Sequence, residues 1–202
     1  MGLVASTLKS DLVSAFNAMR NGDNKIFSQR VSAAVKKFAE SGSIATIDAG
    51  GVSAGAFTGA GTGKITVDDS ICEEIVYAAC ITMNDMKSGG NNYLASQLAT
   101  GINTMIAAGD VKTDVSGTVV PPNGSSFPLS GKATGKMTCV PAPMQAVFIS
   151  TFNTMDGMLK GGGDDYMAQQ VSAAVDSYLK AGAVSTKGDG ALSGSTGAGK
   201  MT

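Results

Sequence analysis

Three short phrases with the pattern Gly-Lys-x-Thr recur along the chain, and this repetition constrains the fold more than any other feature of the sequence. They are Gly63-Lys64-Ile65-Thr66, Gly135-Lys136-Met137-Thr138 and Gly199-Lys200-Met201-Thr202. A second phrase, Val31-Ser32-Ala33-Ala34-Val35, recurs letter for letter at 171–175, with a degenerate copy at 98–102. Self-similarity of this kind indicates several copies of one supersecondary unit.

Each copy of the second phrase lies in a segment whose apolar residues have helical spacing. In the first copy these residues are Phe27, Val31, Ala34, Val35 and Phe38. Each segment ends at a shared glycine, Gly42, Gly109 or Gly182, which suits a helix C-cap in the left-handed conformation. A second apolar segment precedes each one, and turn-forming residues such as Ser88 to Asn92 join the two. We therefore expect a helical hairpin in each unit.

After the shared glycine, apolar and polar residues alternate as in a β-strand, for example from Val111 to Val115. A loop leads to a second extended stretch, which finishes at a Gly-Lys phrase. We predict an α+β fold of three tandem pseudo-repeats, each a helical hairpin followed by a glycine-rich two-stranded β segment. The units span residues 1–67, 68–139 and 140–202. Their length exceeds the roughly 20–50 residues of common solenoid repeats, so we expect three small lobes with approximate threefold symmetry or in a row.

The Gly-Lys phrases do not have the features of a nucleotide site. A phosphate loop needs a serine or threonine directly after the lysine, whereas these positions hold Ile65, Met137 and Met201. Histidine is absent, which removes the usual Ser-His and Cys-His nucleophile arrangements. Acidic pairs such as Asp68-Asp69 fall where negative charge complements a helix dipole. We expect no catalytic residue, cofactor or metal and hence no enzyme; a further alternative is an enzyme with a carboxylate-bound metal.

The charge balance narrows the class of partner. With 15 Lys and Arg against 16 Asp and Glu, the net charge is -1, which gives no basis for binding nucleic acid or an anionic membrane. No apolar stretch reaches the roughly 18 residues of a membrane span, and polar residues from Lys9 to Asp11 interrupt any signal peptide. We expect a protein made in the cytoplasm whose partners are proteins. The low net charge favours a packed subunit and a homo-oligomer.

The glycine-rich strands are the candidate contact regions. Strands with so few side chains are expected to offer exposed edges to which another subunit adds a strand. The candidate interface residues are the following: Thr46, Gly63, Lys64, Thr113, Gly135, Lys136, Thr186, Gly199 and Lys200.

The pattern V-S-A-A-V-x-x-[FY]-x-x-x-G-x-[IV]-x-T, followed by a glycine-rich strand and GKMT, resembles small virion structural proteins of tailed bacteriophages. The matching positions run from Val31 to Thr46, from Leu98 to Thr113 and from Val171 to Thr186. The resemblance implies a non-enzymatic subunit of a phage head, neck or tail that is located in the virion and contacts other virion proteins. The alternative is a soluble repeat-type binding module for a small molecule or peptide.

Overall fold

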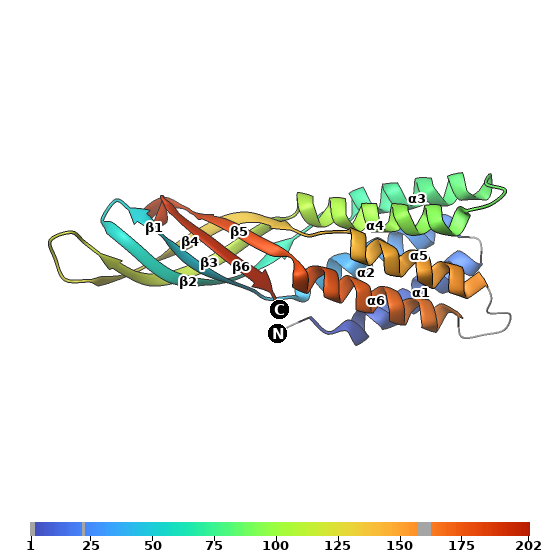
Figure 1. The fold of residues 1–202 in the computed structure, drawn as a ribbon, viewed down its shortest axis with the longest axis horizontal. Helices are drawn as coiled ribbons and strands as arrows, with labels where there is room; N and C mark the ends of the chain where they lie inside the picture. The colour runs from blue at the N-terminus through green and yellow to red at the C-terminus, as the bar shows by residue number, and fades with distance from the viewer. Residues whose placement is uncertain (1–2, 22, 157–162) are drawn as a thin grey trace.

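The protein is elongated, with helices forming one half and strands the other, as the computed structural model in Figure 1 shows. The structure describes residues 3–21, 23–156 and 163–202. The helices are α1 (Ala5–Arg20), α2 (Asn24–Ser41), α3 (Ser70–Asn84), α4 (Gly90–Ala108), α5 (Ala142–Asp156) and α6 (Gly163–Ala181). The strands are β1 (Ile44–Val52), β2 (Gly55–Thr66), β3 (Asp110–Val120), β4 (Phe127–Thr138), β5 (Ala183–Gly188) and β6 (Ser195–Met201), with a short 3-10 helix η1 (Gly190–Leu192) before β6.

All the strands belong to one closed antiparallel barrel. They pair in the order of the sequence, and β1 closes the barrel on β6. Ile44 therefore lies opposite Gly63 on one side and opposite Met201 on the other. Residues alternate between the interior and the outer surface along each strand, as a pleated backbone requires.

The prediction of three lobes, each with its own two-stranded segment, is wrong. The strands of one segment also pair with those of the next: β2 pairs with β3 and β4 pairs with β5. A lone glycine-rich hairpin buries little apolar surface and leaves two open edges. Closing the barrel pairs the backbone N–H and C=O groups of these edges with a neighbouring strand. The exposed edges expected along the glycine-rich strands are consequently occupied over the paired length of the barrel.

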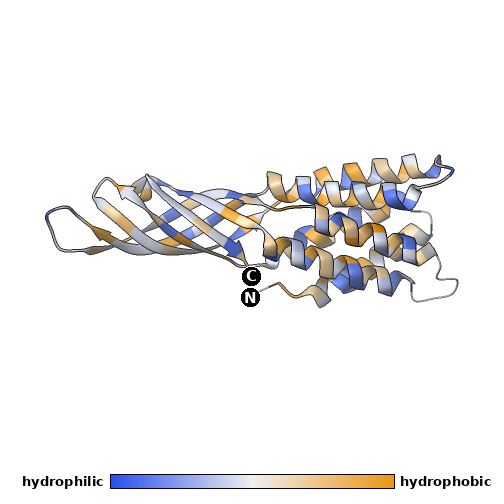
Figure 2. Cartoon of the chain, in the orientation of Figure 1, coloured by the Kyte–Doolittle hydropathy of each residue, from blue (hydrophilic) through white to orange (hydrophobic). Residues whose placement is uncertain are grey.

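The helices likewise share one core. Each packs against both of its neighbours, and α1 contacts α6 to complete a ring. Equivalent positions of α1, α3 and α5 point into this core and are at most 2% exposed: Leu8, Cys72 and Met144, then Leu12, Val76 and Phe148, then Phe16, Cys80 and Phe152. The core continues into the barrel through Ile44, Val111 and Val184. In Figure 2 hydrophobic residues recur along the helices, whereas much of the barrel is pale.

The three glycines at the junctions between helix and strand are needed for space. Gly42 and Gly109 have φ of -63° and -59°, so the predicted left-handed C-cap is wrong at both positions. A Cβ at Gly109 would lie 2.6 Å from Val67 Cγ1, and one at Gly182 would lie 2.4 Å from Met137 Cε. At Gly109 and Gly182, side chains from the end of the preceding strand pair fill the space that a Cβ would need, and at Gly42 this space is filled by Met201 of β6 and by Leu3.

Candidate functional site

The middle of the barrel contains a layer in which threonine and glycine alternate. Thr46, Thr113 and Thr186 point inward and are each 3% exposed. Each threonine lies opposite a glycine of a Gly-Lys phrase on the adjacent strand: Thr46 opposite Gly199, Thr113 opposite Gly63, and Thr186 opposite Gly135. The two sets of repeated residues, which are far apart in the sequence, thus meet in one ring.

Glycine is required in this ring because adjacent strands approach closely. A Cβ on Gly63 would lie 1.9 Å from the backbone oxygen of Lys112, a distance at which the atoms overlap. The same 1.9 Å applies between Gly135 and the oxygen of Ser185, and between Gly199 and the oxygen of Ala45. The Gly-Lys phrases therefore set the width of the barrel.

The candidate interface residues divide into two groups. The threonines and glycines face the interior of the barrel, whereas Lys64, Lys136 and Lys200 are exposed on its outer surface. Lys136 donates hydrogen bonds of 2.8 Å to the backbone oxygen of Ala108 and to Asp110 Oδ1, which holds the end of α4 to β4. Contact with a partner remains a prediction for the three lysines; the threonine side chains are enclosed.

Sequence reasoning missed Asp48, a carboxylate inside the barrel that is 1% exposed. Thr46 donates a hydrogen bond of 2.6 Å to Oδ2, and Thr186 donates one of 3.4 Å to Oδ1. Gly197 lies opposite both Asp48 and Thr186, and a Cβ there would be 2.1 Å from Asp48 Oδ1. The hydrogen bond from Thr186 on β5 to Asp48 on β1 therefore crosses the intervening strand β6 at Gly197, which has no side chain in the way. The strand alternation of Ile44, Thr46 and Asp48 is the signal that could have placed this carboxylate inside.

The polar layer separates the main core from a second apolar cluster near the free end of the barrel. This cluster consists of the buried residues Val52, Phe57, Val115, Val119, Ala133 and Leu192. Leu192 comes from η1 and covers Gly131, where a Cβ would lie 2.9 Å from Leu192 Cδ1. This cluster is a small hydrophobic core that packs the end of the barrel separately from the main core.

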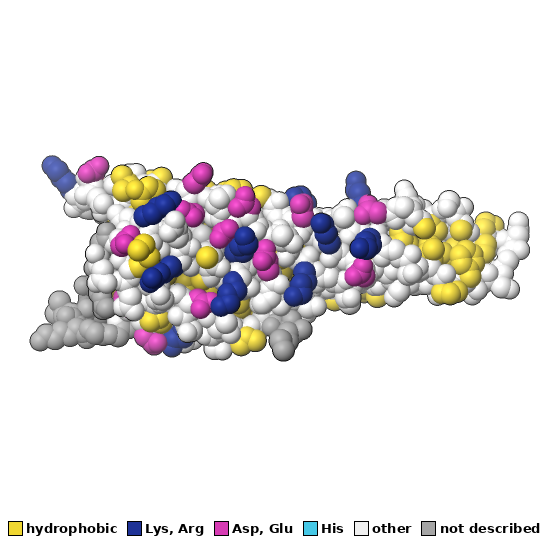
Figure 3. Space-filling model, turned by 180° about the vertical axis from the view of Figure 1, so that it is seen from behind, with side chains coloured by type: hydrophobic (Ala, Val, Ile, Leu, Met, Phe, Trp, Pro, Cys, Tyr) yellow, Lys and Arg dark blue, Asp and Glu magenta, His cyan; other side chains and the backbone are white. Residues whose placement is uncertain are grey.

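Beyond this cluster, the β3–β4 hairpin presents an apolar surface that we call the barrel tip. It consists of Val120, Pro121, Pro122, Phe127 and Pro128. Val120 is 55% exposed and Phe127 is 39% exposed. Figure 3 shows hydrophobic side chains gathered at this end, whereas charges of both signs are spread over the bundle. Contiguous exposed apolar patches mark sites of protein interaction, so the barrel tip is the candidate functional site.

One edge of the barrel tip lacks a neighbouring strand. β4 pairs with β3 from Phe127 onward, but its pairing with β5 starts only at Ala133 opposite Gly188. Pro128 lies in this open segment and has no N–H to donate, which limits pairing with a further strand. Contacts at the barrel tip are therefore expected to be made by side chains.

Several titratable groups of the described residues take part in structural contacts. Burial raises the pKa of Cys72 and Cys80 to about 11, which keeps both thiols protonated and unreactive at neutral pH. Lys36 forms an ion pair of 3.1 Å with Asp69 at the start of α3.

Within 3–21, 23–156 and 163–202, no three His, Cys, Asp or Glu side chains are grouped so that they could hold a metal ion. None of the helices in these ranges has the length and apolar content needed to cross a bilayer.

Replacing a glycine of the threonine and glycine layer should destabilise the barrel. For Gly135→Ala we expect the free energy of unfolding to fall by about 1–3 kcal/mol, because the new Cβ overlaps the Ser185 backbone oxygen. Gly51→Ala is the matched control in β1, since no atom lies within 4 Å of its Cβ position, and it should change stability by less than about 0.5 kcal/mol. Urea denaturation measures both; equal effects would contradict the steric explanation.

Removing the enclosed carboxylate should also destabilise the protein. Asp48→Ala leaves the hydroxyls of Thr46 and Thr186 without their acceptor, and we expect a loss of about 1–3 kcal/mol. Asp114→Ala, at an exposed position on the outer face of β3, should stay within about 0.5 kcal/mol of the parent protein. If thermal unfolding showed both variants to be as stable as the parent, the interior hydrogen bonds would contribute nothing.

The ion pair between Lys136 on β4 and Asp110 on β3 can be tested by titration. The hydrogen bond and charge of Lys136 lower the pKa of Asp110, so Lys136→Met should raise that pKa toward its usual value. A lowered pKa means that this ion pair stabilises the fold above the unfolded-state pKa of Asp110, and that this stabilisation is lost as pH falls through the lowered value. Carboxyl NMR shifts followed over pH measure the change, and Lys200→Met on β6 is the control that should leave Asp110 unaffected.

Comparison of the chain with protein-family models, curated proteins and solved structures finds no match. The function is therefore inferred from the geometry of this chain and from its sequence pattern.

Proposed function

We propose that the protein is a non-enzymatic structural subunit of a tailed-phage virion, a component of the head, neck or tail that makes repeated protein–protein contacts. The observation that carries this proposal is the apolar barrel tip at one end of an elongated body (Figure 3). The sequence pattern from Val31 to Thr46 and its two copies, which resembles virion proteins, supports the same function.

The construction of the barrel suits a contact-making role. Side chains and closely spaced backbone fill its interior, and the cluster around Phe57 and Val119 packs directly beneath the tip. A surface on such a support loses little conformational freedom when a partner binds, which favours association. Val120 and Phe127 are then held outward as apolar anchors for a neighbouring protein.

Away from the barrel tip, the surface of the bundle carries charges of both signs. Ion pairs hold helices to their neighbours, such as the pair of 3.0 Å between Lys9 and Asp165 and the pair of 2.8 Å between Lys37 and Asp11. With charges of both signs interspersed, the bundle creates no strong field of one sign. Association through the barrel tip would consequently depend little on salt.

The proposal predicts that the protein self-associates through the barrel tip. Light scattering on a sizing column should give a mass that rises above the 20.2 kDa of one chain as the concentration increases. The double variant Val120→Lys/Phe127→Lys should lower that mass toward one chain, because two lysines at the tip repel each other and are strongly hydrated. Far-ultraviolet circular dichroism checks that its fold is kept.

Ile47→Lys provides the matched control. Ile47 is 78% exposed, but it lies on the wall of the barrel in β1 rather than at the tip. The control should self-associate as the parent protein does. A compact monomer at every concentration, or equal loss of association in the control, would contradict self-association through the barrel tip.

A further inference from the structure

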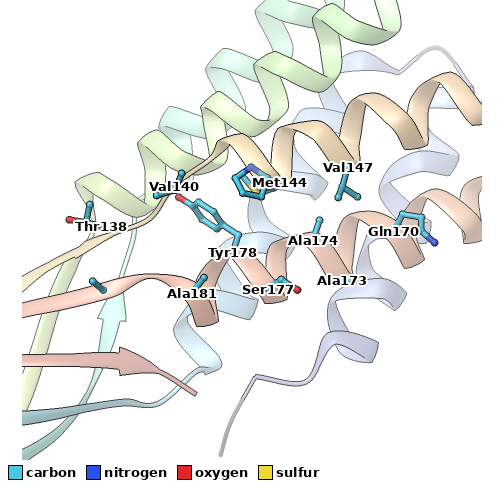
Figure 4. A pocket seen from close by; sticks show the side chains of 12 residues that line it. Thr138, Val140, Met144, Val147, Gln170, Ala173, Ala174, Ser177, Tyr178 and Ala181 are labelled. Atoms are coloured by element: carbon cyan, nitrogen blue, oxygen red, sulfur yellow. The ribbon is translucent and has the colours of Figure 1, made fainter.

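A cavity of about 610 Å³ lies between α5 and α6, beside the junction with the barrel. Figure 4 shows Met144 and Val147 of α5 on one side and Ala174 and Tyr178 of α6 on the other. Thr138 and Ala183 bound it at the barrel end. None of the described residues that line this cavity is charged, although charges are spread over the bundle.

The equivalent position between α1 and α2 is also hollow, with a volume of about 520 Å³, but the charged residues Asp11, Arg30 and Lys37 line it. Asp11 stands where α5 has Val147, and Lys37 stands where α6 has Ser177, as the alignment of the repeated helices shows. These two form an ion pair of 2.8 Å across the two helices. Arg30, in the place of Gln170, adds hydrogen bonds of 3.1 Å and 2.9 Å to the backbone oxygen and Oγ of Ser14.

The equivalent position between α3 and α4 is closed by a short helix separation. Gly101 stands where α6 has Ala174. A Cβ on Gly101 would lie 3.2 Å from Cys72 Sγ and 3.5 Å from Cys72 Cα, so the helices already pack closely there. Within the described residues, α5–α6 differs from the other two hairpins because Val147, Ser177 and Ala174 line the space without charge and without closing it.

The polar groups of the cavity indicate the chemistry of its occupant. The Tyr178 hydroxyl donates a hydrogen bond of 2.9 Å to Asn103 Oδ1 on α4, so its ring is fixed in place. Burial raises the pKa of Tyr178, which keeps the phenol neutral. Gln170, Ser177 and Thr138 offer uncharged hydrogen-bonding groups at the margin. A charged ligand would lose hydration here without gaining an opposite charge.

We propose that the α5–α6 cavity binds an uncharged, mainly apolar small molecule that carries one or two hydrogen-bonding groups. The cavity volume lies within the roughly 300–1,000 Å³ of small-molecule sites, and its combination of apolar walls with a few polar groups is typical of them. This site is distinct from the barrel tip, and the proposal stands whether or not the protein belongs to a virion.

The test transfers the charged pair found between α1 and α2 to the cavity. N-phenyl-1-naphthylamine, an uncharged apolar fluorophore, should bind the full-length protein saturably with one site per chain. Val147→Asp/Ser177→Lys installs the equivalents of Asp11 and Lys37 and should weaken binding at least tenfold. Ile75→Asp/Thr104→Lys places the same pair across α3 and α4, where Gly101 already closes the space, and should leave binding unchanged.

A second variant separates blocking from a change in fold. Ala174→Met fills the cavity with an apolar side chain and no charge, and it should weaken binding of the same probe by a similar factor. Thermal unfolding followed by circular dichroism identifies the variants that remain folded. Absence of saturable binding, binding that persists in both folded cavity variants, or equal loss in the α3–α4 control would each overturn the proposal.

Discussion

The close approach of strands around the threonine and glycine layer is the constraint on which the rest of the structure depends. Where Gly63, Gly135 and Gly199 face the threonines of the adjacent strands, any Cβ would overlap a backbone oxygen. The barrel is therefore narrow, and small side chains are enough to fill its interior. Because the strands close on each other, the helical hairpins that precede them are drawn into one ring with one core.

The barrel is not a simple extension of that core. A polar layer around Asp48 lies between the main core and the cluster at the free end. The hydroxyls of Thr46 and Thr186 satisfy the carboxylate, and Gly197 makes room for the bond between β5 and β1. A satisfied buried polar group of this kind favours one strand register over a slipped one. The separate end cluster then supports the barrel tip independently of the helices.

The features with a proposed function lie where the repeated segments differ from one another. Only the β3–β4 hairpin carries the prolines and exposed Val120 and Phe127 of the barrel tip. Similarly, the α5–α6 hairpin has Val147 and Ser177 where α1–α2 has an ion pair. The shared residues build the scaffold, and the divergent residues give the barrel tip and the α5–α6 cavity their own chemistry.

The sequence by itself determined the local structure: apolar spacing located helices such as the one around Val31, and strict alternation located strands such as Val111 to Val115. It also marked the Gly-Lys phrases as structural, because hydroxyl residues are missing where a phosphate loop needs them. Only the tertiary structure decided that the strands close into one barrel, since local patterns do not specify which edges pair. Strand alternation places Asp48 and the threonines on one face of their strands, but their enclosure, the apolar tip and the α5–α6 cavity depend on distant segments that only the tertiary structure brings together.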